Sequence, residues 1–309
     1  MIKQISIDEF EEIRTLLDDY VETHESGIFQ LQMPFQDRLK KALETERIGI
    51  FAEFYGSKPI GFVVLGLGFS NINVLYVDPA IEDIKTIEHG LFDYGFDYLS
   101  KKSDTVKIGG RKLGTTLEGY FEIKGFQKFN RKHMTLSREA IESLEHQKLP
   151  IEFRFIDYSS DMREEVAEIV YKANIENIDM QVFPEFFGTL ENAIRLLNDT
   201  EQNRYGEYKE PYSKVLTCNG DMIGACFLTK TSDDTGYIPD ICLLQEYRGR
   251  GLGKVLLVHC LKEMVRLDEG ITKINLDVTL DNPARYLYES LGYKDVRSYS
   301  MYSWTRNEK

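Results

Sequence analysis

Gln245-Glu-Tyr-Arg-Gly-Arg-Gly-Leu-Gly-Lys254 is a basic, glycine-rich segment that directly follows an apolar run at residues 238–244. The apolar run, the glycines and the helical pattern of residues 254–267 predict a buried strand, a turn and then a helix. Glycines let the backbone approach a ligand closely, and the free N–H groups at the start of a helix bind anions. Arg248 and Arg250 add positive charge. The segment therefore predicts a binding site for a pyrophosphate group.

Two common nucleotide-binding motifs do not fit this segment. The P-loop would require glycine at position 248 and serine or threonine at position 255, where the chain has Arg248 and Val255. The dinucleotide motif G-x-G-x-x-G would require glycine at position 254 after Gly249 and Gly251, where the chain has Lys254. Both kinds of nucleotide site are excluded on these residues.

The spacing R-x-x-G-x-G does fit, at Arg248, Gly251 and Gly253. This spacing resembles the acyl-CoA loop of the GNAT N-acetyltransferase superfamily. An ordinary glycine-rich connection between a strand and a helix is the alternative, since short motifs also occur by chance.

A second segment, some forty residues downstream, resembles the closing motif of the same family, N-x-x-A-x-x-L-Y-x-x-x-G-F/Y. Asn282 is followed by Ala284 one residue earlier than in the family pattern, and the residues in register are Leu287, Tyr288, Gly292 and Tyr293. Pro283 is suited to the first position of a helix, and Gly292 to the left-handed residue that ends one. Two such motifs in the family's order indicate an acetyltransferase domain over most of residues 151–309.

The resemblance implies acetyl-CoA as the co-substrate. The residues expected to bind it are Leu243, Leu244, Arg248, Gly249, Arg250, Gly251, Leu252, Gly253, Lys254, Asn282 and Arg285. The resemblance also implies an α/β (α+β) fold with a mixed, mainly antiparallel central sheet flanked by helices.

Acetyl transfer from a thioester requires a donor that polarises the carbonyl group. Pro239 cannot donate a hydrogen bond to a neighbouring strand, so it predicts a bulge or an edge within its strand. In the family this strand separates from its neighbour, and by resemblance the N–H near Leu243 would face the thioester carbonyl. An edge strand that merely contains a proline is the alternative.

Two side chains are expected to carry the proton transfers. By resemblance, Tyr288 is the general acid that protonates the departing thiolate, with its neighbour Tyr286 as the alternative. Asp240 is the candidate general base, because a carboxylate on an apolar strand is costly unless it is paired or functional. Binding of the acceptor's ammonium group, capping of a bulge, or deprotonation through water are alternatives for Asp240. Tyr237 stands about where some family members carry a glutamate.

Selection of the acceptor is expected from residues 178–187, which connect two predicted helices. The side chains singled out there are Gln181, Phe183, Glu185 and Phe186. An aromatic stripe of this kind is more often part of a core than of a pocket.

The chain contains the same unit twice. Gly125 and Phe126 in the first half correspond to Gly292 and Tyr293 in the second half. At the same spacing along the chain, Phe121 corresponds to Tyr288. The paired elements are predicted as strands 2–7 and 151–157, helices 8–24 and 161–178, strands 47–55 and 213–218, strands 59–67 and 222–229, strands 72–77 and 237–244, helices 84–100 and 251–268, strands 105–109 and 272–278, helices 115–123 and 283–290, and strands 126–136 and 293–304. We therefore predict two tandem GNAT-like domains, at 1–145 and 146–309.

The first unit lacks the phosphate loop. At the corresponding place it has Ile81-Glu-Asp-Ile-Lys-Thr86, without a glycine, and Glu82 and Asp83 would repel a pyrophosphate. With Phe121 in place of the tyrosine as well, we predict that this domain is degenerate and non-catalytic. Its expected role is that of an intramolecular partner for the second domain.

Composition limits the other classes of function. The formal net charge of −13 argues against nucleic-acid binding, and no window has the roughly 20 consecutive apolar residues of a membrane span. The chain starts without the pattern of a secretory signal, and its four cysteines lack metal-ligand spacing, so a cytoplasmic protein without a metal is expected.

Three functions remain after these exclusions. The first is an acetyl-CoA-dependent N-acetyltransferase that acts directly on a primary amine of a small molecule. The second is a non-catalytic CoA-binding regulatory or scaffold protein, which the intact loop and Tyr288 disfavour. The third is acetylation of a peptide or protein, which nothing in the sequence separates from the first.

Overall fold

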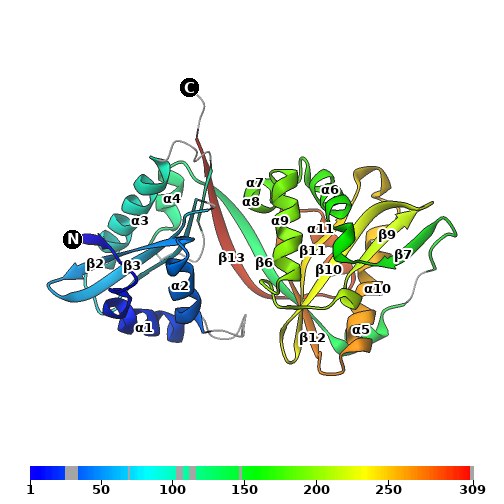
Figure 1. Ribbon diagram of the computed structural model, residues 1–309, viewed down its shortest axis with the longest axis horizontal. Helices are drawn as coiled ribbons and strands as arrows, with labels where there is room; N and C mark the ends of the chain where they lie inside the picture. The colour runs from blue at the N-terminus through cyan, green and yellow to red at the C-terminus, as the bar shows by residue number, and fades with distance from the viewer. Residues whose placement is uncertain (25–33, 69, 102–106, 111–115, 146–147, 307–309) are drawn as a thin grey trace. The chain divides into compact units, whose positions relative to one another are not determined.

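The computed structural model describes residues 1–24, 34–68, 70–101, 107–110, 116–145 and 148–306, and its chain divides into two compact units. Unit 1 comprises Met1–Phe129 with Ser300–Lys309, and unit 2 comprises Asn130–Tyr299 (Figure 1). Each unit is built around its own sheet, with helices on both faces.

Unit 1 has the strand order β1-β2-β3-β4-β5-β13. Its elements are β1 (Ile2–Gln4), α1 (Arg14–His24), α2 (Phe35–Glu44), β2 (Ile48–Tyr55), β3 (Lys58–Gly66), β4 (Asn71–Val77), α3 (Ile84–Ser100), β5 (Lys107–Gly110), α4 (Glu118–Ile123) and the end of β13 (Lys294–Thr305). Side chains alternate along its central strands: Ile50 and Ala52 pack beneath α1, whereas Phe51 packs beneath α3. The sheet is therefore buried on both faces.

Unit 2 has the strand order β6-β12-β11-β10-β9-β7, with the short β8 (Glu207–Tyr208) also on β10. Its other elements are β6 (Gln127–Ser137), α5 (Arg138–Ser143), β7 (Phe153–Asp157), α6 (Arg163–Asn174), α7 (Ile178–Val182), α8 (Pro184–Phe187), α9 (Leu190–Glu201), β9 (Lys214–Cys218), β10 (Asp221–Ser232), β11 (Thr235–Leu243), α10 (Leu252–Leu267), β12 (Lys273–Thr279) and α11 (Ala284–Ser290). Helices α6 and α9 cover one face, and α10 with α5 covers the other. The predicted repeat is confirmed in its element order.

The closing strands of the two repeats are exchanged between the units. The closing strand of the first repeat, β6, pairs with β12 of unit 2 from Arg131↔Thr279 to Ser137↔Lys273. The closing strand of the second repeat, β13, pairs with β5 of unit 1 from Tyr302↔Gly110 to Thr305↔Lys107. This corrects the predicted division at 145/146, because residues 130–145 lie in unit 2 and the last residues of the chain lie in unit 1.

The exchange predicts the behaviour of a fragment. A protein consisting of residues 148–309 lacks β6 and so exposes the edge of β12, with its unpaired backbone groups. We expect this fragment to aggregate or to lose activity, as measured by light scattering and acetyl-CoA consumption. A monodisperse, fully active fragment would show that the first repeat is dispensable for the second.

In the first repeat, an aspartate side chain occupies the helix start that corresponds to the phosphate loop of the second repeat. Asp83 precedes α3, and its carboxylate accepts a hydrogen bond from the N–H of Thr86 at 3.2 Å. Phe121, the counterpart of Tyr288, is buried and stacks on Tyr302 with ring centroids 4.1 Å apart. A helix start occupied by a carboxylate repels an anion. The degeneracy of this site stays a prediction.

No described helix is long and apolar enough to cross a membrane. The four cysteines are free thiols, and the described residues contain no group of histidine, cysteine, aspartate and glutamate side chains suited to holding a metal ion.

Candidate functional site

Strands β11 and β12 of unit 2 pair for only part of their length. Their parallel ladder runs from Thr235↔Lys273 to Tyr237↔Asn275 and then stops, although β11 continues to Leu243 and β12 to Thr279. The second half of β11 has therefore lost its neighbour on one side. The predicted separation of this strand is present in the structure.

A bulge at Pro239 starts the separation. On the other side of β11 the register with β10 shifts between Thr229↔Tyr237 and Phe227↔Asp240, so that Ile238 and Pro239 lie opposite a single residue. Proline has no N–H to donate, and an extra residue bends the strand that carries it. The predicted bulge at Pro239 is confirmed.

The backbone N–H of Leu243 points into the gap. Leu243 lies opposite Gly224, and the N–H of Leu244 bonds to the carbonyl of Ile223 at 2.9 Å. This pattern makes Leu243 and Gly224 a non-hydrogen-bonded pair, in which the N–H of Leu243 points away from β10. It points to the side that β12 has left, where a carbonyl group can accept it.

The glycine-rich segment continues from this strand. After the 3₁₀ turn Gln245–Tyr247, Gly249 and Gly251 have φ values of 74° and 77°, and α10 begins at Leu252 without a side-chain cap on its N-terminal N–H groups. Left-handed backbone of this kind favours glycine. Gly253 lies in the first turn of α10, where a Cβ atom would come no closer than 3.9 Å to Leu287 Cδ2. The protein itself therefore has room for a side chain at position 253.

The two arginines of the segment differ in their contacts. Arg248 donates from Nε to the carbonyl of Leu243 at 2.9 Å and from Nη2 to the carbonyl of Ala173 in α6. Arg250 is exposed and donates to the carbonyl of Glu246 at 3.0 Å. Arg248 thus ties the loop to β11 and α6, whereas the exposed Arg250 bonds only within the loop region and Lys254 is half-buried.

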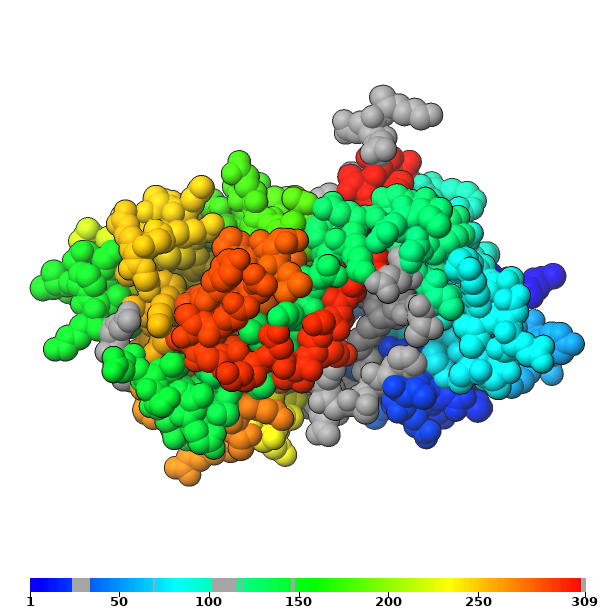
Figure 2. All heavy atoms as spheres, turned by 180° about the vertical axis from the view of Figure 1, so that it is seen from behind, coloured from blue at the N-terminus to red at the C-terminus, as the bar shows by residue number. Residues whose placement is uncertain are grey.

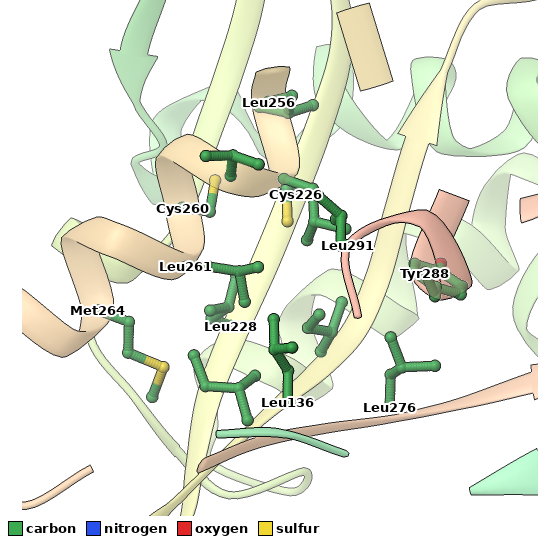
Figure 3. Close-up of a cluster of buried hydrophobic side chains, with 14 of the residues drawn as sticks. Leu136, Cys226, Leu228, Leu256, Cys260, Leu261, Met264, Leu276, Tyr288 and Leu291 are labelled. Carbon is green, nitrogen blue, oxygen red and sulfur yellow. The ribbon is translucent and has the colours of Figure 1, made fainter. Parts of the chain in front are cut away.

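Tyr288 lies on α11, at the edge of the apolar cluster that includes Leu276 and Leu291 (Figure 3). Only 7% of its surface is exposed, against 64% for Tyr286 on the same helix. Burial, with the charges of Asp240 and Asp179, raises the pKa of the Tyr288 phenol above its ordinary value. The phenol therefore keeps its proton at neutral pH, as a general acid requires.

Asp240 lies on β11 after the bulge. Its Oδ2 atom is shielded from solvent and accepts no hydrogen bond from any described residue. Burial raises the pKa of Asp240 to about 7, and the charge of Asp179 adds to the shift, while a hydrogen bond from the N–H of Ile241 opposes it. A half-buried carboxylate with an enclosed, unpaired oxygen and a pKa near neutrality is suited to accept a proton.

Asn282 and Arg285 have contacts within the protein. The Asn282 amide donates to Asp179 at 2.6 Å, and its oxygen accepts from the N–H of Ala284 at 2.9 Å, so it caps α11 and ties it to α7. Arg285 lies over the ring of Tyr286 and 3.7 Å from a carboxylate oxygen of Glu289. Gly292, with φ 93°, ends α11 as predicted. Seen from behind, α11 and the start of β13 form part of the surface of unit 2 (orange to red, Figure 2).

The sequence-based predictions include neither Asp179 nor Arg131. Asp179 lies within the segment that is expected to select the acceptor, but the residues predicted there are Gln181, Phe183, Glu185 and Phe186. In the structure this segment forms α7 and α8, with Gln181 exposed and Glu185 buried. The signal for Arg131 was a basic residue that alternates with Phe129 and His133 on one face of its strand, where it is buried.

Comparison with known proteins agrees with these features. Residues 173–293 match the sequence model described as the acetyltransferase (GNAT) family. A [ribosomal protein bS18]-alanine N-acetyltransferase from Haemophilus influenzae is 31% identical over 113 residues, which span 37% of this chain and 66% of the relative. The match thus covers slightly less than two thirds of that relative's length.

Solved structures show the fold of the whole chain. A tandem GNAT protein from the clavulanic acid biosynthesis pathway aligns with a TM-score of 0.65 and 13% identity over 100% of this chain and 99% of its own. A GCN5-related N-acetyltransferase from Sphaerobacter thermophilus aligns with a TM-score of 0.68 and 14% identity over 99% of this chain and 95% of its own. The match to the GNAT acetyltransferase family thus lies in the second half of the chain, and the solved structures show that the whole chain has the fold of a tandem GNAT protein.

Proposed function

We propose that this protein is an acetyl-CoA-dependent N-acetyltransferase that transfers the acetyl group directly to a primary amine. The observation that carries the proposal is the interrupted ladder between β11 and β12, which leaves the N–H of Leu243 free of a strand partner beside a glycine-rich helix start. The match to the GNAT family implies acetyl-CoA as the co-substrate. The uncapped N–H groups at the start of α10 are suited to bind its pyrophosphate.

Three residues near the gap between β11 and β12 carry out separate steps of the proposed reaction. The N–H of Leu243 polarises the thioester carbonyl, and Asp240 accepts a proton from the attacking amine. The amine nitrogen bonds to the carbonyl carbon, and the carbon–sulfur bond breaks. Tyr288 then donates its proton to the sulfur that leaves. The proton held by Asp240 and the one lost by Tyr288 are exchanged with solvent, so the enzyme returns to its starting state.

A substitution at Gly253 tests ligand binding without disturbing folding. Gly253→Ala is expected to leave thermal stability unchanged or higher, because the site has room for a methyl group and alanine favours helices by about 0.5–1 kcal/mol. The same methyl group would lie where the pyrophosphate approaches, so the Kd for acetyl-CoA should rise about tenfold or more. Calorimetric titration measures both this Kd and the stoichiometry, which is expected to be one site per chain.

Gly90→Ala is the matched control, since Gly90 lies in α3 of the degenerate repeat with nothing within 4 Å of its added Cβ. A Gly253→Ala variant that binds acetyl-CoA like the wild type would remove this helix start from the site. A stoichiometry near two would contradict the degeneracy of the first repeat.

A second candidate acceptor is the N-terminus of a peptide or protein. It is favoured by two relatives, both [ribosomal protein bS18]-alanine N-acetyltransferases, from Haemophilus influenzae and Salmonella typhimurium. An acetyl-CoA consumption screen over small amines, polyamines, amino acids, aminoglycosides and peptides with an N-terminal alanine distinguishes the two acceptors. Binding of CoA without turnover on the whole panel would instead support a non-catalytic, CoA-binding role.

A further inference from the structure

A buried arginine contacts the segment that is expected to select the acceptor. Arg131 belongs to the exchanged strand β6, and only 5% of its surface is exposed. It donates from Nε to the hydroxyl of Tyr299 at 3.1 Å and from Nη1 to the hydroxyl of Thr279 at 2.7 Å. Its guanidinium lies over the ring of Phe183, 4.5 Å from the centroid. A buried cation with this many partners is held in one position.

The same guanidinium binds Asp179. Nη1 of Arg131 lies 3.4 Å from Oδ1 of Asp179, which also accepts from Thr279, while Oδ2 accepts from Asn282 at 2.6 Å. Asp179 is on α7, which the sequence associates with acceptor selection. Both of its oxygens are thus occupied from inside the protein. Asp240 differs from Asp179, because its enclosed Oδ2 atom has no donor among the described residues.

We propose that Arg131 is a positioning residue of the acceptor site, which holds Asp179 and α7 in place and so sets the negative charge that Asp240 experiences. This inference rests on the proposed acetyltransferase function, in which Asp240 is the base. Arg131 belongs to the first repeat of the sequence but lies in unit 2 of the structure. The proposal therefore gives the exchanged strand β6 a role in unit 2.

Other titratable groups surround this arrangement. Electrostatic neighbours of Asp240 are Asp179 on α7, Tyr288 on α11, Cys226 on β10 and Cys242 on β11. Asp277 also interacts electrostatically with Arg131, and its carboxylate contacts His133, Tyr237 and Tyr299 at 2.9–3.1 Å. Asp277 thus has its own partners, and Asp179 is the carboxylate through which Arg131 reaches the site.

The charge of Asp179 gives the test a definite direction. Two carboxylates that share a site raise the pKa of one of them, and a neighbouring cation offsets this. Asp179→Asn keeps the size of the side chain and removes its charge, so the titration midpoint of Asp240 should move to lower pH. Arg131→Met leaves Asp179 uncompensated, so the midpoint should move to higher pH. Arg131→Lys keeps the charge and should hold the midpoint near that of the wild type.

Two readouts follow these variants in the full chain. Carbon-13 NMR of the aspartate carboxyl groups gives the Asp240 midpoint without turnover, and the pH profile of kcat/KM for the acceptor gives it during turnover. Arg131→Met is expected to lower kcat/KM for the acceptor by roughly 10–100-fold through misplacement of α7, with the Kd for acetyl-CoA within twofold of the wild type. Arg266→Met, which removes an exposed arginine paired with Glu263 on α10, is the control and should change none of these values.

The outcomes separate this inference from the proposed function. An Asp240 midpoint that Asp179→Asn leaves unchanged overturns the inference, even if Arg131→Met fails to fold. Acceptor kinetics of Arg131→Met equal to those of the wild type also overturn it. A wild-type protein that acetylates no amine overturns the proposed function, whatever the midpoints show.

Discussion

Replacing Tyr288 by phenylalanine is expected to lower kcat by roughly 10²–10⁴-fold, which is the usual contribution of one general acid. The substitution removes the proton donor and almost no contact area, because the ring packs among apolar side chains such as Leu276 and Leu291 (Figure 3). The Kd for acetyl-CoA should therefore stay close to that of the wild type. Steady-state kinetics with calorimetric titration measures both quantities.

Tyr286→Phe is the matched control, because Tyr286 lies on the same helix with its side chain largely in solvent. It should retain wild-type kcat. An unchanged rate in Tyr288→Phe would exclude this phenol from the mechanism, and a loss in Tyr286→Phe alone would assign the role to its neighbour.

Replacing Asp240 by asparagine is expected to separate activity from stability. The variant loses the proton acceptor, so kcat/KM for the acceptor should fall by roughly 10²–10⁴-fold at pH 8. It also loses a carboxylate whose Oδ2 atom is enclosed without a donor among the described residues. The free energy of unfolding at pH 8 should therefore rise, by about 1–3 kcal/mol, since each pKa unit corresponds to about 1.4 kcal/mol.

The sign of this effect follows from proton binding. The pKa of Asp240 is raised to about 7 in the folded protein, above the value near 4 of an exposed carboxyl group. Between about pH 4 and pH 7 the folded state thus binds more protons at this site than the unfolded state, and stability falls as pH rises through that window. Asparagine does not titrate, so the difference between variant and wild type should be small at pH 4 and largest above pH 7.

Chemical denaturation at several pH values measures this difference. Asp233→Asn, at an exposed position beyond the end of β10, is the control and should show neither the gain in stability nor the loss of activity. An Asp240→Asn variant that is fully active would remove Asp240 as the base. Equal stability of variant and wild type at pH 8 would mean that the carboxylate is solvated rather than enclosed.

Local sequence determined most of the elements. Helix α3 occupies the predicted residues 84–100, and the two central hairpins form at Gly56 and at Asn219-Gly220, where positive φ values require such residues. The bulge at Pro239 and the left-handed glycines of the loop also follow from single residues. These features depend on the backbone preferences of a few neighbouring residues, and those preferences are present in the chain itself.

Only the tertiary structure decided which sheet each closing strand joins. Strands β6 and β13 both join a sheet in the antiparallel direction, and alternation of side chains does not distinguish the edge of β12 from that of β5. The boundary predicted at 145/146 therefore differs from the division between the two units, and the sequence does not associate Arg131 with the site. Its contacts with Asp179, Thr279 and Tyr299 join residues that lie far apart in the chain, and no local preference encodes them. The sequence alone therefore determined the elements and the glycine loop, whereas the pairing of strands decided which charges surround Asp240.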